Sequence, residues 1–233
     1  MATLRILSAG AAQAVTERII DAFRRDTGHE VVADFGAVGA MKKKVTAGEP
    51  VDVITLTRPM IDELIASGVV RPGSRFDLGK VGTGIAVRAG TPVPDVSTAD
   101  ALSARIRTAT RIVCPDPAVA TAGRIVMALL EKLGIADEVR ERLQFFPNGY
   151  AAMAWLSQTR GTGELGITQV TEILPNKGVS YAGPLPEAFQ QKAVYSVGLA
   201  AKAPEAALAK DFIARFSAPS VRALLTEAGY EPA

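Results

Sequence analysis

The fold is decided by residues 4–28, which read LRILSAGAAQAVTERIIDAFRRDTG. The apolar run at residues 4–8 predicts a buried β-strand, and the small residues after it predict a turn. Apolar residues then recur at three- and four-residue spacing, which predicts one face of an amphipathic helix. That face carries Val15, Ile19, Ala22 and Phe23. A strand that leads directly into a helix is the building unit of an α/β fold.

The same alternation of strand and helix continues along the chain. Further strands are predicted at residues 31–35, 51–56, 81–88, 112–114, 165–168, 179–182 and 191–201, and further helices at 40–47, 60–67, 121–133, 150–157 and, as a pair, between 204 and 228. Strands separated by helices favour parallel pairing with helical crossovers. We therefore expect parallel-rich sheets flanked by helices, arranged as two lobes. Lobe I is residues 1–82 with 195–233, lobe II is residues 83–194, and the runs at 81–88 and 191–201 are expected to cross between them as a hinge.

The composition excludes several classes of protein. With 233 residues, of which 48% are hydrophobic and 21% charged, the chain can bury a globular core. A net charge of +2 predicts no broad basic surface for nucleic acid, and no apolar stretch approaches the ~20 residues of a membrane span. A single cysteine, Cys114, excludes an intramolecular disulfide, and a single histidine, His29, argues against a metal site or a Ser-His-Asp triad. We expect a monomer with no metal and no cofactor.

The start of the sequence bears on location. Residues 1–8 read as the approach to a strand rather than as a charged segment followed by an apolar leader. We expect a periplasmic protein if a signal peptide has been removed, and a cytoplasmic one if Met1 is the native start.

Four loops of small residues stand where helices are predicted to begin. They are Gly10-Ala11-Ala12, Val38-Gly39-Ala40, Thr121-Ala122-Gly123 and Asn148-Gly149-Tyr150. Small residues let a ligand approach backbone N–H groups, and the start of a helix favours negative charge. Because ligands of open α/β sheets bind beyond the carboxyl ends of the strands, we expect a small anion in a cleft between the two lobes. The alternative is that these residues only allow tight packing at strand–helix turns.

Polar side chains near the same loops are candidates for direct contact with the anion. Arg58 follows a predicted strand and Arg124 lies in the first turn of a predicted helix, and a guanidinium matches a carboxylate with two donors. Each arginine is alternatively a solvated surface charge or the partner of a nearby acid. Thr168 and Gln169 end another predicted strand and offer a hydroxyl and an amide.

Three further residues have simpler interpretations. Glu172 is expected on the exposed surface of a helix. The alternative is that Glu172 acts as a general base. Cys114 is expected in the core because it lies on a buried strand. His29 is expected in an exposed turn.

Several of these segments together resemble the periplasmic molybdate-binding proteins of ABC transporters, within the wider type II solute-binding family. The resemblance covers nearly the whole chain, and its most specific segment is Gly48-Glu49-Pro50-Val51-Asp52-Val53. The other segments are residues 6–12, 35–41, 116–117 with 122–123, and 163–167. The resemblance implies a type II periplasmic-binding-protein fold, a ligand between two α/β lobes, and hinge closure that an ABC permease reads.

The sequence departs from that family where the ligand is expected. Family members that hold molybdate carry serine hydroxyls in the first two loops and a tyrosine after residues 166–167. The matching positions here are Ala11, Val38 (or Gly39 if the loop shifts by one) and Gln169. Each lost hydrogen bond to a charged group removes about 1.5–3 kcal/mol of binding free energy. We therefore expect that a carboxylate, with two or three acid groups, replaces the oxyanion.

A second function follows from the same resemblance. An aconitate isomerase belongs to this binding-protein family, so the fold is compatible with a cofactor-free isomerase that shifts an allylic proton on a polycarboxylic acid. Such chemistry needs a base near the reacting carbon. Glu172, Tyr150 or a lysine are the candidates, and the sequence does not choose between them. Anion binding without chemistry is the leading hypothesis.

Overall fold

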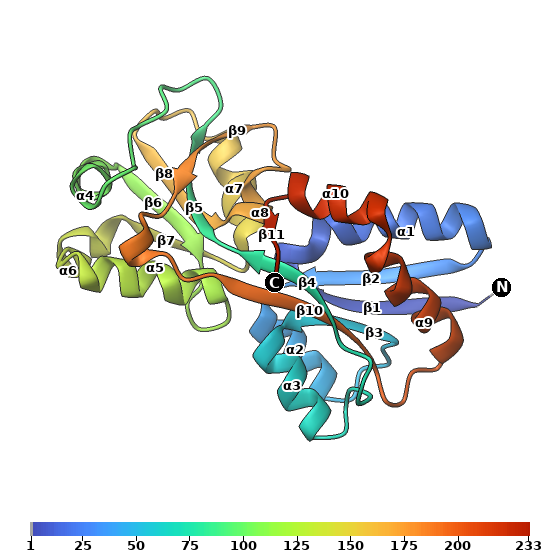
Figure 1. Ribbon diagram of the computed structural model, residues 1–233. Coiled ribbons are helices and arrows are strands. Elements are labelled where there is room, and N and C mark those ends of the chain that lie inside the picture. Colours follow the sequence, from blue (N-terminus) through green and yellow to red (C-terminus); the bar gives the residue numbers. More distant parts are fainter. Residues whose placement is uncertain (1) are drawn as a thin grey trace. The chain divides into compact units, whose positions relative to one another are not determined.

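The computed structural model describes residues 2–233, which form two compact units (Figure 1). Unit 1 comprises the chain up to Val81 together with Ala193–Ala233, and unit 2 is Gly82–Lys192. The chain therefore passes from unit 1 to unit 2 after Val81 and returns at Ala193. Each unit is an α/β structure built on its own sheet, as the alternating pattern of the sequence predicts.

Unit 1 is built on a mixed sheet in the strand order β11-β4-β10-β3-β1-β2. The strands are β1 (Thr3–Ala9), β2 (Glu30–Gly36), β3 (Val53–Thr57), β4 (Phe76–Val81), β10 (Ala193–Leu199) and β11 (Tyr230–Glu231). β1 pairs in parallel with β2 and β3, whereas β10 pairs antiparallel with both β3 and β4. The parallel part is the one that the strand–helix repetition of the first 80 residues predicts.

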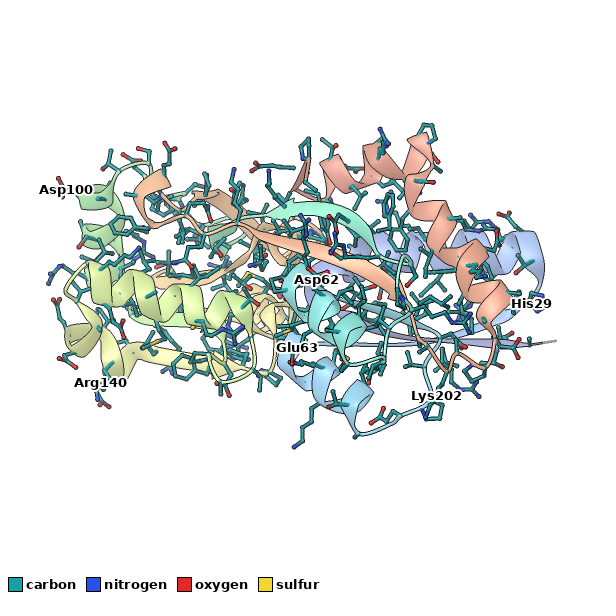
Figure 2. The ribbon with its side chains drawn as sticks, turned by 60° about the horizontal axis from the view of Figure 1, so that its bottom comes forward. His29, Asp62, Glu63, Asp100, Arg140 and Lys202 are labelled. Carbon is teal, nitrogen blue, oxygen red and sulfur yellow. The ribbon has the colours of Figure 1, made fainter. Side chains whose placement is uncertain are left out.

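Helices cover both faces of this sheet. They are η1 (Gly10–Ala12), α1 (Gln13–Thr27), α2 (Val38–Thr46), α3 (Arg58–Ala66), α9 (Ala206–Ala214), η4 (Arg215–Ser217) and α10 (Pro219–Glu227). In Figure 1, α1 and α10 lie on one side of the sheet, and α2 and α3 lie on the other. The apolar face predicted for α1 is the buried one, whereas Asp62 and Glu63 of α3 are exposed (Figure 2).

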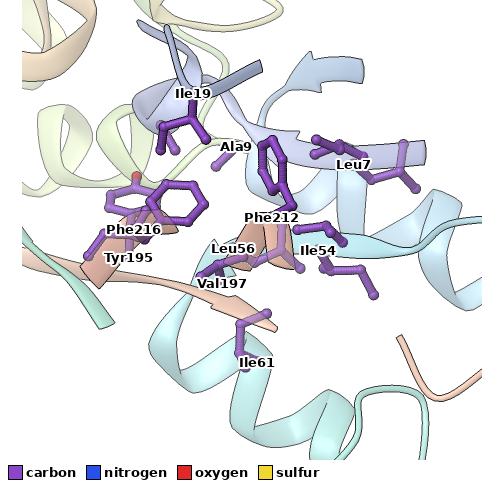
Figure 3. Close-up of a cluster of buried hydrophobic side chains, with 14 of the residues drawn as sticks. Leu7, Ala9, Ile19, Ile54, Leu56, Ile61, Tyr195, Val197, Phe212 and Phe216 are labelled. Carbon is purple, nitrogen blue, oxygen red and sulfur yellow. The ribbon is translucent and has the colours of Figure 1, made fainter. Parts of the chain in front are cut away.

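Aromatic side chains join the two ends of the chain inside unit 1. Phe212 of α9 packs edge-on against Phe23 of α1, with 5.5 Å between ring centroids, and against Phe216 of η4 at 5.9 Å. All three rings are fully buried, and Phe212 and Phe216 lie in the cluster shown in Figure 3. Edge-to-face pairs add about 0.5–1.5 kcal/mol beyond the area that they bury. The C-terminal helices are therefore part of the core that the first helix forms.

Unit 2 has a second mixed sheet, in the order β7-β6-β8-β5-β9. Its strands are β5 (Thr83–Arg88), β6 (Arg111–Pro115), β7 (Leu143–Phe146), β8 (Glu164–Gln169) and β9 (Val179–Pro184). Its helices are α4 (Ala99–Thr108), α5 (Thr121–Lys132), α6 (Ala136–Val139), η2 (Arg140–Arg142), α7 (Gly149–Gln158), α8 (Val170–Ile173) and η3 (Glu187–Phe189). β6 is parallel to β7 and β8, and β5 is antiparallel to β8 and β9.

The two faces of the unit 2 sheet bury different side chains. Ile85 and Ile167 belong to a cluster that α4 and α5 complete, whereas Ala86 and Val113 pack with residues of α7. Neighbouring residues of a strand point to opposite faces, which explains why Ile85 and Ala86 fall in separate clusters. This alternation decides below which candidate residues lie together.

The predicted strand pattern lacks β7 and β11, and it is wrong at residues 81–88 and 191–201. The run at 81–88 is two strands in two sheets, because Gly82 separates β4 from β5 and its carbonyl accepts a hydrogen bond from Val170 N. The strand predicted at 191–201 is shorter, since only Ala193–Leu199 has partners in β3 and β4. Among residues 2–233, every helix is too short or too polar to cross a bilayer.

Candidate functional site

The candidate residues of unit 1 gather at one edge of its sheet. β1, β2 and β3 are parallel, and their register places Ala9 beside Gly36 and Ser8 beside Thr55. Each strand leads into a helical segment at this edge: β1 into η1, β2 into α2 and β3 into α3. The residues that follow the three strands are Gly10, Ala11, Ala12, Val38, Gly39 and Arg58.

Two of these helices begin earlier than the sequence predicts. α2 starts at Val38 rather than at residue 40, and α3 starts at Arg58 rather than at residue 60. Pro59 explains the second difference, because its fixed backbone angle suits the first helical turn. Gly39 and Arg58 therefore lie in first turns, whose backbone N–H groups have no acceptor within their own helix.

The small residues at this edge offer backbone groups rather than side-chain donors. Gly10, Ala11, Ala12 and Val38 are all buried. The residues before α2 and α3 are Ala37 and Thr57, and no side-chain capping bond to either helix is present among the described residues. Helix starts without a side-chain cap retain N–H donors and partial positive charge, which suits an external anion.

Arg58 is an accessible cation at the same edge. Its side chain is 46% exposed, and Nη1 lies 3.5 Å from Oδ2 of Asp77. Asp77 also receives Nε of Arg75 at 3.2 Å and the hydroxyl of Ser196 at 2.7 Å. Arg58 is thus the partner of an acid, as the alternative interpretation expects. Because Arg75 shares that acid and Arg58 is half exposed, the Arg58 guanidinium retains donors toward solvent.

In unit 2 the corresponding edge is set by β6, β7 and β8. Their parallel carboxyl ends lead toward α5, α7 and α8, and the antiparallel strand β5 begins at this edge with Thr83 beside Gln169. The predicted residues at this edge are Thr121, Ala122, Arg124, Asn148, Tyr150, Thr168 and Gln169. They do not all lie on one face. Gln169 is two residues after Ile167, so its side chain lies on the side of the sheet that α5 covers, here called the α5 face. Thr168 points to the opposite side, which α7 covers and which is here called the α7 face.

The α5 face combines a helix start with polar groups. Ala120 precedes α5, with no side-chain capping bond among the described residues. Arg124 is exposed, and its Nη2 donates to Oγ1 of Thr121 at 3.3 Å. Gln169 is only 2% exposed, and neither atom of its amide has a hydrogen-bond partner within residues 2–233. The hydroxyl of Thr83, opposite Gln169, is also buried without a partner in that range.

The α7 face differs because the protein's own carboxylate occupies the helix start. Oε2 of Glu172 accepts from the hydroxyl of Thr168 at 2.6 Å, and Oε1 accepts from Gly149 N at 3.3 Å. Asn148 caps α7 by accepting from Ala151 N at 2.8 Å. A Cβ on Gly149 would collide with both the Glu172 carboxylate and the Thr168 hydroxyl. Only glycine therefore lets the carboxylate approach the start of α7.

The surface position predicted for Glu172 is wrong. The side chain is 5% exposed, because α8 packs against α7 and the ends of β5, β8 and β9. Burial raises the pKa of the Glu172 carboxyl to about 7, although hydrogen bonds from Thr168 and from the backbone at Gly149 and Gln169 act in the opposite direction. A carboxyl with such a pKa exchanges a proton near neutral pH.

A model of bacterial extracellular solute-binding proteins matches residues 4–231. The chain belongs to this family. Its fold is also that of the periplasmic molybdate-binding protein of Azotobacter vinelandii, with a TM-score of 0.84, 22% identity and 99% of each chain covered. The type II fold inferred from the sequence resemblance is thereby confirmed.

Two curated proteins show how the relatives of this solute-binding protein differ in function. Aconitate isomerase from a Pseudomonas species is 25% identical over 99% of this chain and 88% of its own length. The molybdate-binding protein ModA of Escherichia coli K12 is 22% identical over 84% of this chain and 76% of its own length. One relative is thus named for an enzyme activity and the other for a bound oxyanion.

The remaining predictions concern residues away from these edges. Cys114 is buried as predicted, and burial raises the pKa of its thiol to about 12. His29 is half-buried rather than exposed, and its Nδ1 accepts a hydrogen bond from Ala2 N at 3.3 Å. In the described part of this solute-binding protein, no group of three or more acidic, cysteine or histidine side chains is arranged to hold a metal ion.

Thr83 is the residue that sequence reasoning missed. The sequence gives no reason to single out one threonine at the start of a strand, because its importance comes from its partner across the sheet. A prediction of β5–β8 register would have found it, since Gln169 was already a candidate.

Proposed function

We propose that this protein binds a small organic anion carrying two or three carboxylates and delivers it to an ABC permease. Membership of the solute-binding family supports the transport role. This role would place the protein outside the cytoplasm. The residues at the two sheet edges support a proposal for the class of ligand that is carried.

The observation that carries the proposal is the absence of hydroxyl side chains at Ala11 and Val38. Both residues lie at helix starts and are buried, so they supply only backbone N–H groups. A tetrahedral oxyanion needs hydrogen-bond donors all around it. Each lost donor removes about 1.5–3 kcal/mol of binding free energy. Arg58 and Arg124 supply separate cationic groups instead, which suit an acid whose carboxylates are spaced along a carbon chain.

The sequence predicts one ligand cleft shared by the two units, and substitutions in each unit test this prediction. Arg58→Ala changes unit 1 and Arg124→Ala changes unit 2. If one ligand contacts both units, each variant should weaken binding by about 1.5–3 kcal/mol in calorimetry. Arg140→Ala is the matched control, because Arg140 is exposed and pairs with Asp137 on the surface.

A thermal-shift screen over anions tests the ligand class. Succinate, citrate and cis-aconitate should raise the melting temperature more than molybdate or sulfate at equal concentration, since tighter ligands stabilise the folded state more. Calorimetry with the strongest ligand then gives the affinity of the wild type and of the variants. A larger shift with molybdate than with every carboxylate would overturn the proposal.

A second candidate is an isomerase that moves a proton between two carbon atoms of an unsaturated tricarboxylate. The 25% identical aconitate isomerase favours it, and so does the buried carboxyl of Glu172, whose pKa of about 7 suits both removing and returning a proton. Tyr150, in the first turn of α7, is the other candidate acid or base. NMR of cis-aconitate incubated with the protein tests this activity: formation of trans-aconitate that Glu172→Gln abolishes supports it, and unchanged substrate refutes it.

A further inference from the structure

The α5 face of unit 2 holds two buried polar side chains that the fold leaves without partners. Thr83 and Gln169 are paired residues on the antiparallel strands β5 and β8, so their side chains point to the same face. Thr83 is fully buried and Gln169 is 2% exposed. Within the described part of the chain, the Thr83 hydroxyl and both ends of the Gln169 amide make no hydrogen bond.

The fold satisfies the backbone groups of Thr83 and the hydroxyl of Thr168 next to this pair. The side-chain amide of Gln190 accepts from Thr83 N at 2.8 Å and donates to Thr83 O at 2.9 Å. The neighbouring hydroxyl of Thr168 donates to Glu172 on the other face. Because a buried polar group without a partner costs free energy, two adjacent ones indicate that something outside the chain completes them.

The chemistry of the pair restricts what that group is. The Gln169 amide offers two donors and one acceptor, and the Thr83 hydroxyl offers one donor and accepts as well. An ionised carboxylate, sulfate or molybdate only accepts, so it would leave the Gln169 carbonyl oxygen unpaired. A ligand hydroxyl beside a carboxylate donates to that oxygen while the carboxylate accepts from the amide N–H and from Thr83.

We propose that Thr83 and Gln169 form a neutral subsite that selects carboxylates carrying a hydroxyl group. This inference rests on the proposed function, because it names the class of anion that the site prefers. The start of α5 and Arg124 belong to the same face of unit 2, where they supply the positive charge for the carboxylate. The pair itself adds no charge, so it acts on selectivity more than on total affinity.

Matched ligands test the subsite directly. Malate differs from succinate, and citrate from tricarballylate, by one hydroxyl. Calorimetry at pH 7.5 should find each hydroxylated acid bound about five- to tenfold more tightly, as one buried hydrogen bond predicts. Thr83→Val and Gln169→Met should bring both ratios close to one, whereas Thr83→Ser, which keeps the hydroxyl, should retain the preference.

Thr16→Val is the control substitution. Thr16 is equally buried with an unpartnered hydroxyl among residues 2–233, but it lies on α1 of unit 1. Its removal should leave both ratios unchanged. Equal affinities within each pair for the wild type would overturn the subsite and leave anion binding intact, while no binding of any carboxylate would overturn the proposed function itself.

Discussion

Glu172→Gln should remove a pH dependence of stability that the wild type shows between about pH 4.5 and pH 7. The carboxyl is buried in unit 2, where it accepts hydrogen bonds from Thr168 and Gly149. A glutamine has the same shape, since its oxygen still accepts from Gly149 N while its NH₂ donates to the Thr168 oxygen. The substitution therefore removes the ionisation and keeps the packing.

The direction of the effect follows from the two pKa values. The pKa of this carboxyl is 4.5 ordinarily and about 7 in the folded protein. Below pH 4.5 the Glu172 carboxyl is neutral in both the folded and the unfolded protein, so its burial carries no electrostatic penalty. Between the two values the unfolded chain has lost its proton and the folded protein has kept it, so the free energy of unfolding falls as pH rises. Each pH unit corresponds to about 1.4 kcal/mol, and the total loss approaches about 3 kcal/mol above pH 7.

Urea unfolding followed by circular dichroism from pH 4.5 to 8.5 measures the effect. The variant and the wild type should be about equally stable at pH 4.5, and the variant should be more stable by up to about 3 kcal/mol at pH 8. All other titratable groups are the same in both proteins, so the difference reports the substitution alone. Glu141→Gln, at an exposed glutamate of η2, should give a difference that does not vary with pH. A constant difference for Glu172→Gln as well would refute the reasoning.

Three further substitutions test the packing. Gly149→Ala should destabilise the protein by about 1–3 kcal/mol and lower its melting temperature, because the methyl group displaces the Glu172 carboxylate. Phe212→Ala should cost about 3–5 kcal/mol in urea unfolding, because it leaves a cavity between two other buried rings; a loss below 1 kcal/mol would contradict that packing. Asp52→Ala should cost about 2–5 kcal/mol by the same assay, since each carboxylate oxygen of this buried side chain accepts a backbone N–H, at 2.8 and 2.7 Å.

Much of the candidate site was predictable because its residues are marked by local patterns. Gly10, Gly39 and Thr121 follow predicted strands, and the parallel pairing in each unit brings such positions to a common edge of its sheet. Arg58 and Arg124 were predictable as candidates for the same reason. In contrast, the sequence did not reveal that the unit 2 candidates divide between two faces, because it does not show which helix covers each face of the sheet.

The sequence by itself determined the α/β class, the order of most strands and helices, and the family, because apolar periodicity and short motifs are properties of neighbouring residues. Only the tertiary structure decided that Glu172 is buried at the start of α7 and that Thr83 lies opposite Gln169. It also decided that β4 and β5 belong to different sheets. Burial and strand register depend on residues distant in sequence, so no local pattern specifies them.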